Sequence, residues 1–166
     1  MPNQNKGQLR WLWVSALMLV MDFTTKLYAL QHLTYNEPVK VLPFLNITLA
    51  FNRGAAFSFL AYEDGWQLWF FSSIAIIVAI VILYWLTQVP RNRNLQAISL
   101  CLILSGAIGN VFDRINYGYV IDFIDLHYKS YHWPTFNIAD SAICIGAFFF
   151  VISSIFCRKK EKNKTN

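Results

Sequence analysis

The chain has 166 residues, of which 56% are hydrophobic, 17% aromatic and only 14% charged. This composition argues against an ordinary soluble domain of that length and favours a membrane protein. The formal net charge is +5, but no basic stripe with interleaved aromatic residues accompanies it, so we expect no nucleic-acid partner.

Four apolar segments are each close to the ~20 residues that cross a ~30 Å hydrocarbon core. They lie at residues 11–30, 66–87, 95–113 and 137–157. The sequence therefore predicts a single membrane domain over residues 1–166, an all-α bundle of four transmembrane helices.

Basic residues set the expected orientation of these spans. Lys and Arg collect before the first span, in the 88–94 loop and after the last span, and Glu161 is the only acid on these flanks. Because cytoplasmic flanks are enriched in Lys and Arg, we expect both termini to be cytoplasmic. The outer side then receives residues 31–65 and 114–136.

The first span contains two charged residues. Asp22 and Lys26 lie four positions apart, so they share one helix face and can form an ion pair. The pair either makes burial tolerable or orients other polar groups in a shared cavity. Because the span also lacks a small-x-small cleavage site, we expect it to be retained rather than removed as a signal peptide.

The segment after the first span contains strand-like and turn-like patterns. Residues 41–52 are apolar and β-branched with partial alternation, which predicts one or two short strands on the membrane surface. Asn52, Arg53 and Gly54 then begin a turn, a weak signal when taken alone. The aromatic segment 62–73 suits a helix that enters the membrane from the interface.

The third span ends in a polar cluster. Gly106 and Gly109 are small enough to let another helix approach closely. Asn110 and Arg114 share a helix face near the outer end, with Asp113 beside them. At this depth an amide and a guanidinium need partners, and backbone carbonyls or a carboxylate would suit them.

Two acids follow in an apolar segment, 119–128, whose alternation predicts extended structure. Asp122 and Asp125 are three residues apart, so on a strand their side chains point to opposite faces. Asp122 has the drier surroundings, which makes it the better candidate for a buried site.

The last span begins with Asn137 and Asp140. Helix capping by Asn137, with Asp140 favoured by the positive end of the helix dipole, is a sufficient local explanation for both residue types. Capping does not explain why Asp122 reaches the same membrane depth in an equally apolar setting.

Two carboxyl groups in one site of low dielectric cannot both ionise easily, so one keeps its proton while the other acts as a base. This is the arrangement of aspartic proteases, in which the pair activates a water molecule. The cysteines and histidines have no metal-ligand spacing, and we expect neither a metal ion nor a cofactor. The alternative is a non-catalytic transporter or channel subunit that uses its charges as a relay.

Five motifs occur in order along the chain: MDFTTK (21–26), NRGAAFSFL (52–60), GAIGNVFDR (106–114), YVIDFIDLHY (119–128) and FNIADSAI (136–143). With the predicted topology, the set closely resembles the bacterial lipoprotein signal peptidase family, also called signal peptidase II. The resemblance covers almost the whole chain.

The resemblance implies an intramembrane aspartyl endopeptidase of the bacterial cytoplasmic membrane, active at the outer face. It would cut prolipoproteins on the N-terminal side of a diacylglyceryl-modified cysteine. The catalytic pair would be Asp122 and Asp140. Supporting residues would be Asp22, Lys26, Asn52, Gly54, Asn110, Arg114, Asn137 and Ala139.

The resemblance also implies a small outer β-cradle over 41–58, followed by an interfacial segment that closes over substrate. Expected partners are the lipidated prolipoprotein and membrane lipid. No dimer motif is present, so we expect a monomer.

Overall fold

The computed structural model describes residues 6–54 and 65–162, with only the backbone for residues 157–162. Its helices are α1 (Leu12–His32, after a 3-10 turn at Leu9–Trp11), α2 (Trp66–Gln88), α3 (Asn94–Tyr117) and α4 (Ile138–Lys162). Each contains a stretch long and apolar enough to cross a membrane, which confirms the prediction of four spans.

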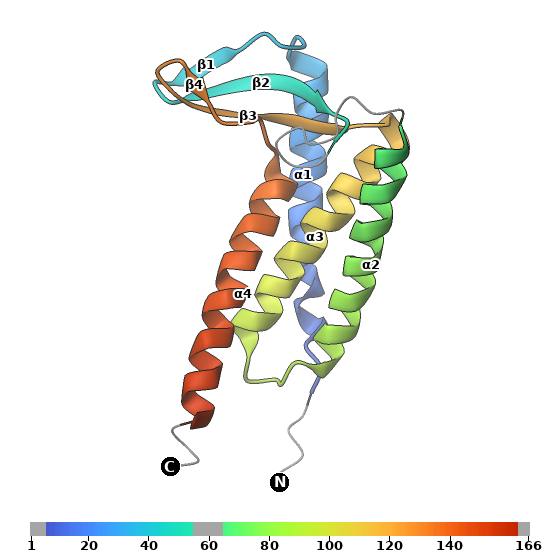
Figure 1. Cartoon of the computed structure of the whole chain (residues 1–166), viewed down its shortest axis with the longest axis vertical. Coiled ribbons are helices and arrows are strands. Elements are labelled where there is room, and N and C mark those ends of the chain that lie inside the picture. Colours follow the sequence, from blue (N-terminus) through green and yellow to red (C-terminus); the bar gives the residue numbers. More distant parts are fainter. Residues whose placement is uncertain (1–5, 55–64, 163–166) are drawn as a thin grey trace.

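Helix α3 lies at the centre of the bundle and packs against α1, α2 and α4 (Figure 1). Glycines bring α3 and α4 together. A methyl group added at Gly106 would overlap the backbone of Ala139, and one at Gly146 would lie 2.7 Å from the carbonyl oxygen of Ser99. The close approach predicted for the third span is therefore present, and it holds the start of α4 against α3.

At its outer end, α3 extends beyond the predicted span. We expected the span to end near residue 113, but the helix continues to Tyr117 and ends at Gly118, whose φ of 78° suits glycine. Asp113 and Arg114 are therefore helical and buried. Their polar groups find partners inside the protein, so the helix need not end where the apolar sequence does.

A four-stranded antiparallel sheet covers the outer ends of the helices, in the order β1 (Val39–Leu42), β2 (Leu45–Asn52), β3 (Val120–Tyr128) and β4 (Tyr131–His132). The segment predicted at 41–52 thus forms two strands separated by a short turn. Strand β3 brings the second outer segment against the first. The sheet is therefore assembled from both outer segments of the chain.

The inner half of the sheet is fixed by a small apolar core. Leu49 of β2 and the β3 residues Ile121 and Phe123 cluster with Ala29 of α1, all buried. This core anchors the first residues of β3 above the bundle. It places Asp122, between Ile121 and Phe123, directly over the polar ends of the helices.

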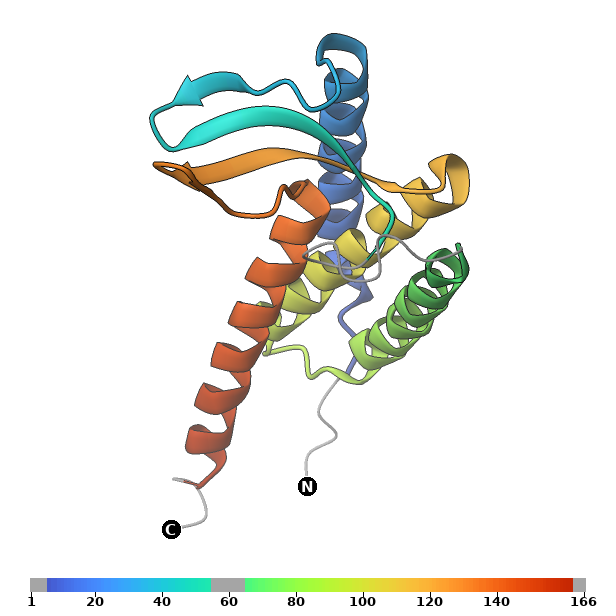
Figure 2. The same cartoon turned by 45° about the horizontal axis from the view of Figure 1, so that its top comes forward.

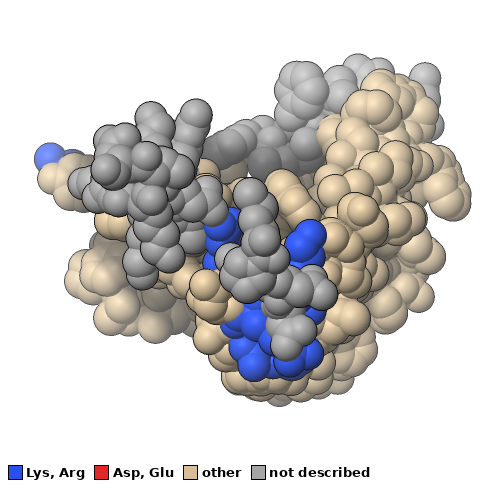
Figure 3. Space-filling view, turned by 90° about the horizontal axis from the view of Figure 1, so that it is seen from below, with Lys and Arg blue, Asp and Glu red and all other residues tan. Residues whose placement is uncertain are grey.

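The end of the bundle opposite the sheet is basic. The first and last described residues lie there (Figure 1), and the view onto this end shows Lys and Arg without visible Asp or Glu (Figure 3). This distribution is what a cytoplasmic face requires. The cytoplasmic location of the termini stays a prediction, as does the interfacial segment, because residues 55–64 lie outside the described residues.

Candidate active site

Asp122 lies on β3 with almost no exposed surface, 1% of its maximum. The side-chain amide of Asn137 donates a hydrogen bond to its Oδ1 at 2.8 Å. Asn52, at the end of β2, also hydrogen-bonds to this carboxyl group. Burial, and next the nearby charge of Asp140, raises the pKa of Asp122 to about 8.

Asp140 lies in the first turn of α4 and accepts hydrogen bonds on both oxygens. Asn110 of α3 donates its side-chain N–H to Oδ1 at 2.8 Å. The backbone N–H of Asn137 donates to Oδ2 at 3.3 Å. These two hydrogen bonds hold the Asp140 carboxyl group in a fixed orientation at the start of α4.

Asn137 joins the two acids. Its Oδ1 accepts from the backbone N–H of Asp140 at 2.8 Å, so Asn137 and Asp140 form a reciprocal capping box at the start of α4. The same side chain donates to Asp122. The predicted capping role is therefore confirmed, and it is also what holds Asp122 and Asp140 at one place.

Lys26 of α1 is the buried cation beneath the two acids. Its Nζ lies 2.7 Å from Asp22 and 2.8 Å from Asp113, and it donates to Asn110 at 3.3 Å. The Asp22–Lys26 pair expected from the sequence is confirmed. Through Asn110, which donates to Asp140, this charged cluster also fixes one side of the acid pair.

Asp22 also reaches the last helix. Its Oδ1 accepts the backbone N–H of Ala139 at 2.9 Å. A methyl group at Gly109 would lie 2.7 Å from the other carboxylate oxygen of Asp22, so glycine leaves room for this contact. The hydrogen bond satisfies an N–H in the first turn of α4 that the helix itself leaves free.

Asp113 is the residue that the sequence reasoning left out of the site. It shares Lys26 with Asp22, and its Oδ2 accepts the backbone N–H of Ile121 at 3.2 Å. It therefore connects the buried cation to the strand that carries Asp122. The position of Asp113, three residues after Asn110, was the available signal that it belongs to the site. Its partner Lys26, however, lies on another helix.

Arg114 hydrogen-bonds to the backbone just after β2. It donates to the carbonyl oxygen of Gly54 at 3.0 Å, while the backbone N–H of Gly54 donates to the side chain of Asn52 at 3.0 Å. Its guanidinium also lies 5.8 Å from the ring centre of Phe71 on α2. All ten residues expected at the site thus belong to one connected cluster.

Asp125 lies outside this cluster. It accepts from the side chains of Asn46 at 3.1 Å and Thr48 at 3.2 Å, and it pairs with His132 at 2.8 Å. Burial alone would raise its pKa, but the hydrogen bonds from His132 and Asn46 outweigh it and hold the pKa below its usual value. The two β3 acids therefore face different surroundings.

Comparison with known proteins identifies the family of the chain. Residues 14–156 match the family model described as signal peptidase (SPase) II. The chain belongs to the signal peptidase II family. Among the described residues, no group of three or more His, Cys, Asp or Glu is placed to hold a metal ion.

Curated relatives of this signal peptidase II family member have nearly its length. The lipoprotein signal peptidase of Alteromonas mediterranea is 48% identical, with 95% of this chain and 86% of the relative aligned. That of Coxiella burnetii is also 48% identical, with 90% and 91% aligned. A solved bacterial membrane enzyme has a TM-score of 0.83 at 31% identity, over 97% of this chain and 95% of its own.

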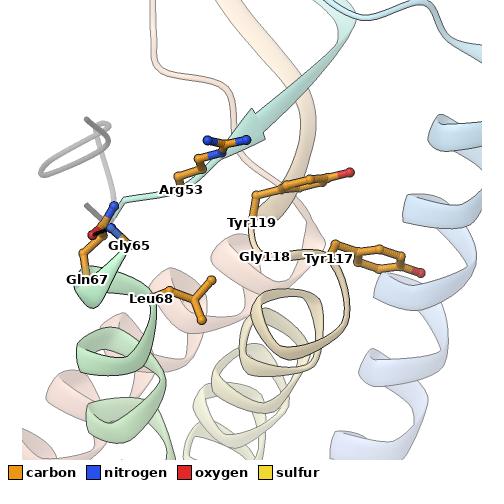
Figure 4. A pocket seen from close by; sticks show the side chains of 7 residues that line it. All are labelled: Arg53, Gly65, Gln67, Leu68, Tyr117, Gly118 and Tyr119. Atoms are coloured by element: carbon orange, nitrogen blue, oxygen red, sulfur yellow. Dashed lines mark hydrogen bonds between the residues drawn. The ribbon is translucent and has the colours of Figure 1, made fainter. Parts of the chain in front are cut away.

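In this signal peptidase II family member, a cavity of about 410 Å³ lies beside the site, at the outer ends of α2 and α3. Arg53 and the top of α2 border one part of it and the turn into β3 borders another (Figure 4). Its lining residues are Arg53, Gly65, Gln67, Leu68, Tyr117, Gly118 and Tyr119. Neither Asp122 nor Asp140 lines this cavity. Arg53 does line it, and Arg53 lies between Asn52 and Gly54, two residues of the cluster.

Proposed function

We propose that this signal peptidase II family member is an intramembrane aspartyl endopeptidase. It removes signal peptides from diacylglyceryl-modified prolipoproteins by cutting on the N-terminal side of the lipidated cysteine. The observation that carries this proposal is the pair of acids, buried Asp122 and partly buried Asp140, that share Asn137. The names of the curated relatives support the substrate class.

In the proposed mechanism, Asp122 is the protonated acid and Asp140 is the base. The raised pKa of Asp122 keeps its proton at neutral pH. Asp140 is less buried than Asp122 and accepts hydrogen bonds from Asn110 and Asn137, so we assign the charge of the pair to Asp140. This division of roles matches the general rule that neighbouring carboxyl groups have their pKa values pushed apart.

The reaction then proceeds in two steps without a covalent enzyme intermediate. Asp140 takes a proton from a water molecule whose oxygen attacks the peptide carbonyl, while Asp122 donates its proton to the carbonyl oxygen. The tetrahedral intermediate then collapses and the C–N bond breaks. A proton passes from Asp140 to the departing nitrogen of the lipidated cysteine, and Asp122 regains its proton from the intermediate's hydroxyl group.

The location of the acids suits a substrate that is half in lipid. Both lie at the end of the bundle covered by the sheet, which we assign to the outer face of the bacterial cytoplasmic membrane (Figure 2). An apolar signal peptide and acyl chains can then approach within the bilayer, and water can reach the acids from outside.

The decisive experiment measures cleavage of a purified diacylglyceryl-prolipoprotein by the wild type and by Asp140→Asn in lipid vesicles. Mass spectrometry of the product locates the cut. We expect Asp140→Asn to lose at least about 10³-fold in rate, since it removes the base. A matched substrate without the diacylglyceryl group tests the substrate class.

Near-wild-type cleavage by Asp140→Asn would refute the two-acid mechanism. Equal cleavage of the two substrates would refute the proposed dependence on the lipid. If the wild type cleaves neither substrate but dissipates an ion gradient in the same vesicles, the alternative of a transporter or channel relay gains support.

A further inference from the structure

The sheet extends sideways beyond the helix that it covers. Strand β3 passes the start of α4 at Ile124, whose backbone N–H and carbonyl group exchange hydrogen bonds with Phe136 at 2.8 and 3.1 Å. Past this point the outer half of the sheet projects beyond α4, in both cartoon views (Figures 1 and 2). Among the helices that the structure describes, none lies directly beneath that half.

The two faces of the projecting half differ in chemistry. Side chains alternate along a strand, so Leu126 and Tyr128 share the face of Asp122, while Asp125 points to the other face. Asp122 is directed toward Asn137 at the start of α4. The face that carries Leu126 and Tyr128 is therefore the one turned toward the start of α4, whereas Ile121 and Phe123, on the opposite face, pack against Ala29 of α1.

Neighbouring strands extend this face. Residues paired across antiparallel strands point the same way, and the pairs Val39↔Ile47, Leu42↔Leu45↔Leu126 and Tyr128↔Tyr131 add side chains from β1, β2 and β4. We call the exposed members the outer apolar face: Val39, Leu42, Leu126, Tyr128 and Tyr131, between 38% and 74% exposed. None of these five residues is charged, although Nζ of Lys129 lies 5.6 Å from the ring centre of Tyr128, whereas the opposite face holds Asp125, Asn46 and His132.

We propose that the outer apolar face rests on the outer leaflet of the membrane, with its side chains at the boundary of headgroups and acyl chains. The four helices fix the position of the bilayer, and the face lies beside α4 at their outer ends. Residues of α4 below it, such as Ile145 and Phe148, are exposed and apolar as lipid contacts require. Tyr side chains with aliphatic neighbours are typical of this interface.

A sheet that rests on the lipid would control the depth of the active site in the membrane. Tyr128 and Asp122 belong to the same strand, six residues apart, or about 20 Å. The β1–β2 turn moves with β3, because the carbonyl group of Phe44 accepts the backbone N–H of His127 at 2.9 Å. Lipid contact at one end of β3 therefore holds Asp122 at a constant height at the other end.

Spin labels on the two faces test the proposal in vesicles without an assay of activity. The native cysteines are first replaced by alanine, and a nitroxide is attached at Tyr131→Cys or, as the matched control, at Lys40→Cys. Lys40 pairs with Asn46, so its side chain lies on the opposite face and is exposed. Collision rates with oxygen, which partitions into lipid, are compared with those of a water-soluble nickel complex.

We expect oxygen collisions to dominate at residue 131 and nickel collisions at residue 40, with ratios that differ at least about threefold. Equal ratios would overturn the proposal. Protection of residue 131 from both reagents would also overturn it, because a protein partner would then cover the face.

A second variant tests the same surface. In a chain labelled at Tyr128→Cys, Leu126→Asp should shift the label toward water, while Lys40→Asp should not. The midpoint of thermal unfolding checks that both variants fold. An unchanged label in folded Leu126→Asp would contradict lipid seating.

Discussion

Strand β3 places two aspartates three residues apart in opposite roles. Asp122, over the helix bundle, has a pKa raised to about 8 by burial and by Asp140. Asp125, farther along the strand, has a lowered pKa because His132, Asn46 and Thr48 offset its burial. The same residue type is therefore costly to ionise at one position and stabilising when ionised at the other.

The difference supports the proposal that Asp122 serves the chemistry and Asp125 the fold. Asp125 has enough partners to satisfy a charge, and such a residue supports stability. Asp122 shares its partner Asn137 with another acid, so its ionised form is poorly compensated. A protein retains such an arrangement at the expense of stability, as expected at a catalytic site.

The largest expected effect is that of Asp122→Asn. It should reduce the cleavage rate at least about 10³-fold, because the proton donor is lost. It should also raise the thermal unfolding midpoint at pH 7, by roughly 2–4 °C for each kcal/mol gained.

The direction of this stability change follows from the raised pKa of Asp122. Between pH 4 and 8 the folded protein keeps a proton that the unfolded chain releases, so this group's contribution to stability is lost as pH rises. The gain from Asp122→Asn should therefore shrink as the pH is lowered toward 4. An active variant, or one less stable than the wild type at pH 7, would contradict the roles given to the two acids.

A smaller effect is expected from Asn137→Ser. Serine can still cap α4, so the free energy of unfolding should change by no more than about 0.5 kcal/mol. The shorter side chain cannot hold Asp122 against Asp140, and we expect a rate loss of about 10- to 100-fold. Asn137→Ala separates the two roles, since it removes the cap as well.

If Asn137→Ser cleaves as well as the wild type, the link between the acids through Asn137 is unnecessary. If both variants lose rate and stability in proportion, capping alone accounts for Asn137.

Asp125→Asn should show the reverse pattern of Asp122→Asn. Cleavage should stay within about threefold of the wild type, because Asp125 does not contact the acid pair. Stability at pH 7 should fall by about 1–2 kcal/mol as charge-assisted hydrogen bonds are lost.

The pH dependence of this loss again follows from the pKa shift. The lowered pKa of Asp125 gives stability above the unfolded pKa, near 4, that disappears as pH falls through the folded value. Denaturation curves of the wild type and the variant should therefore converge at acid pH. Complete loss of cleavage in a folded variant would mean that the wrong β3 acid was assigned to catalysis.

The smallest effect is expected from His132→Ala. The side chain is half exposed, so its pairing with Asp125 should contribute no more than about 1 kcal/mol. Cleavage should be unchanged. A rate loss larger than that of Asp125→Asn would show that the outer half of the sheet affects catalysis by a route other than Asp125.

Much of this arrangement follows from local sequence patterns. Hydropathy predicted the four spans, and alternation along 119–128 predicted that Asp122 and Asp125 diverge. Capping chemistry predicted the start of α4. Each of these depends on neighbours within a few positions, which a sequence displays directly.

Contacts between residues far apart in the sequence were harder to predict. Asp113 was left out of the site because Lys26, its partner, lies 87 positions earlier, on α1. Hydropathy falls at Asp113 and Arg114, so it did not reveal that the helix continues to Tyr117 with both residues buried and partnered inside the protein. The hydrogen bond from Ala139 to Asp22 involves a backbone N–H, which no residue type reveals.

That last hydrogen bond has a consequence for biosynthesis. It joins residues 117 positions apart, one in the first helix to be made and one in the last. A nascent chain that has inserted only α1 to α3 has Asp22, Lys26 and Asp113 but neither Asn137 nor Asp140. Under the proposed mechanism, cleavage therefore cannot begin until α4 has been inserted beside α1 and α3.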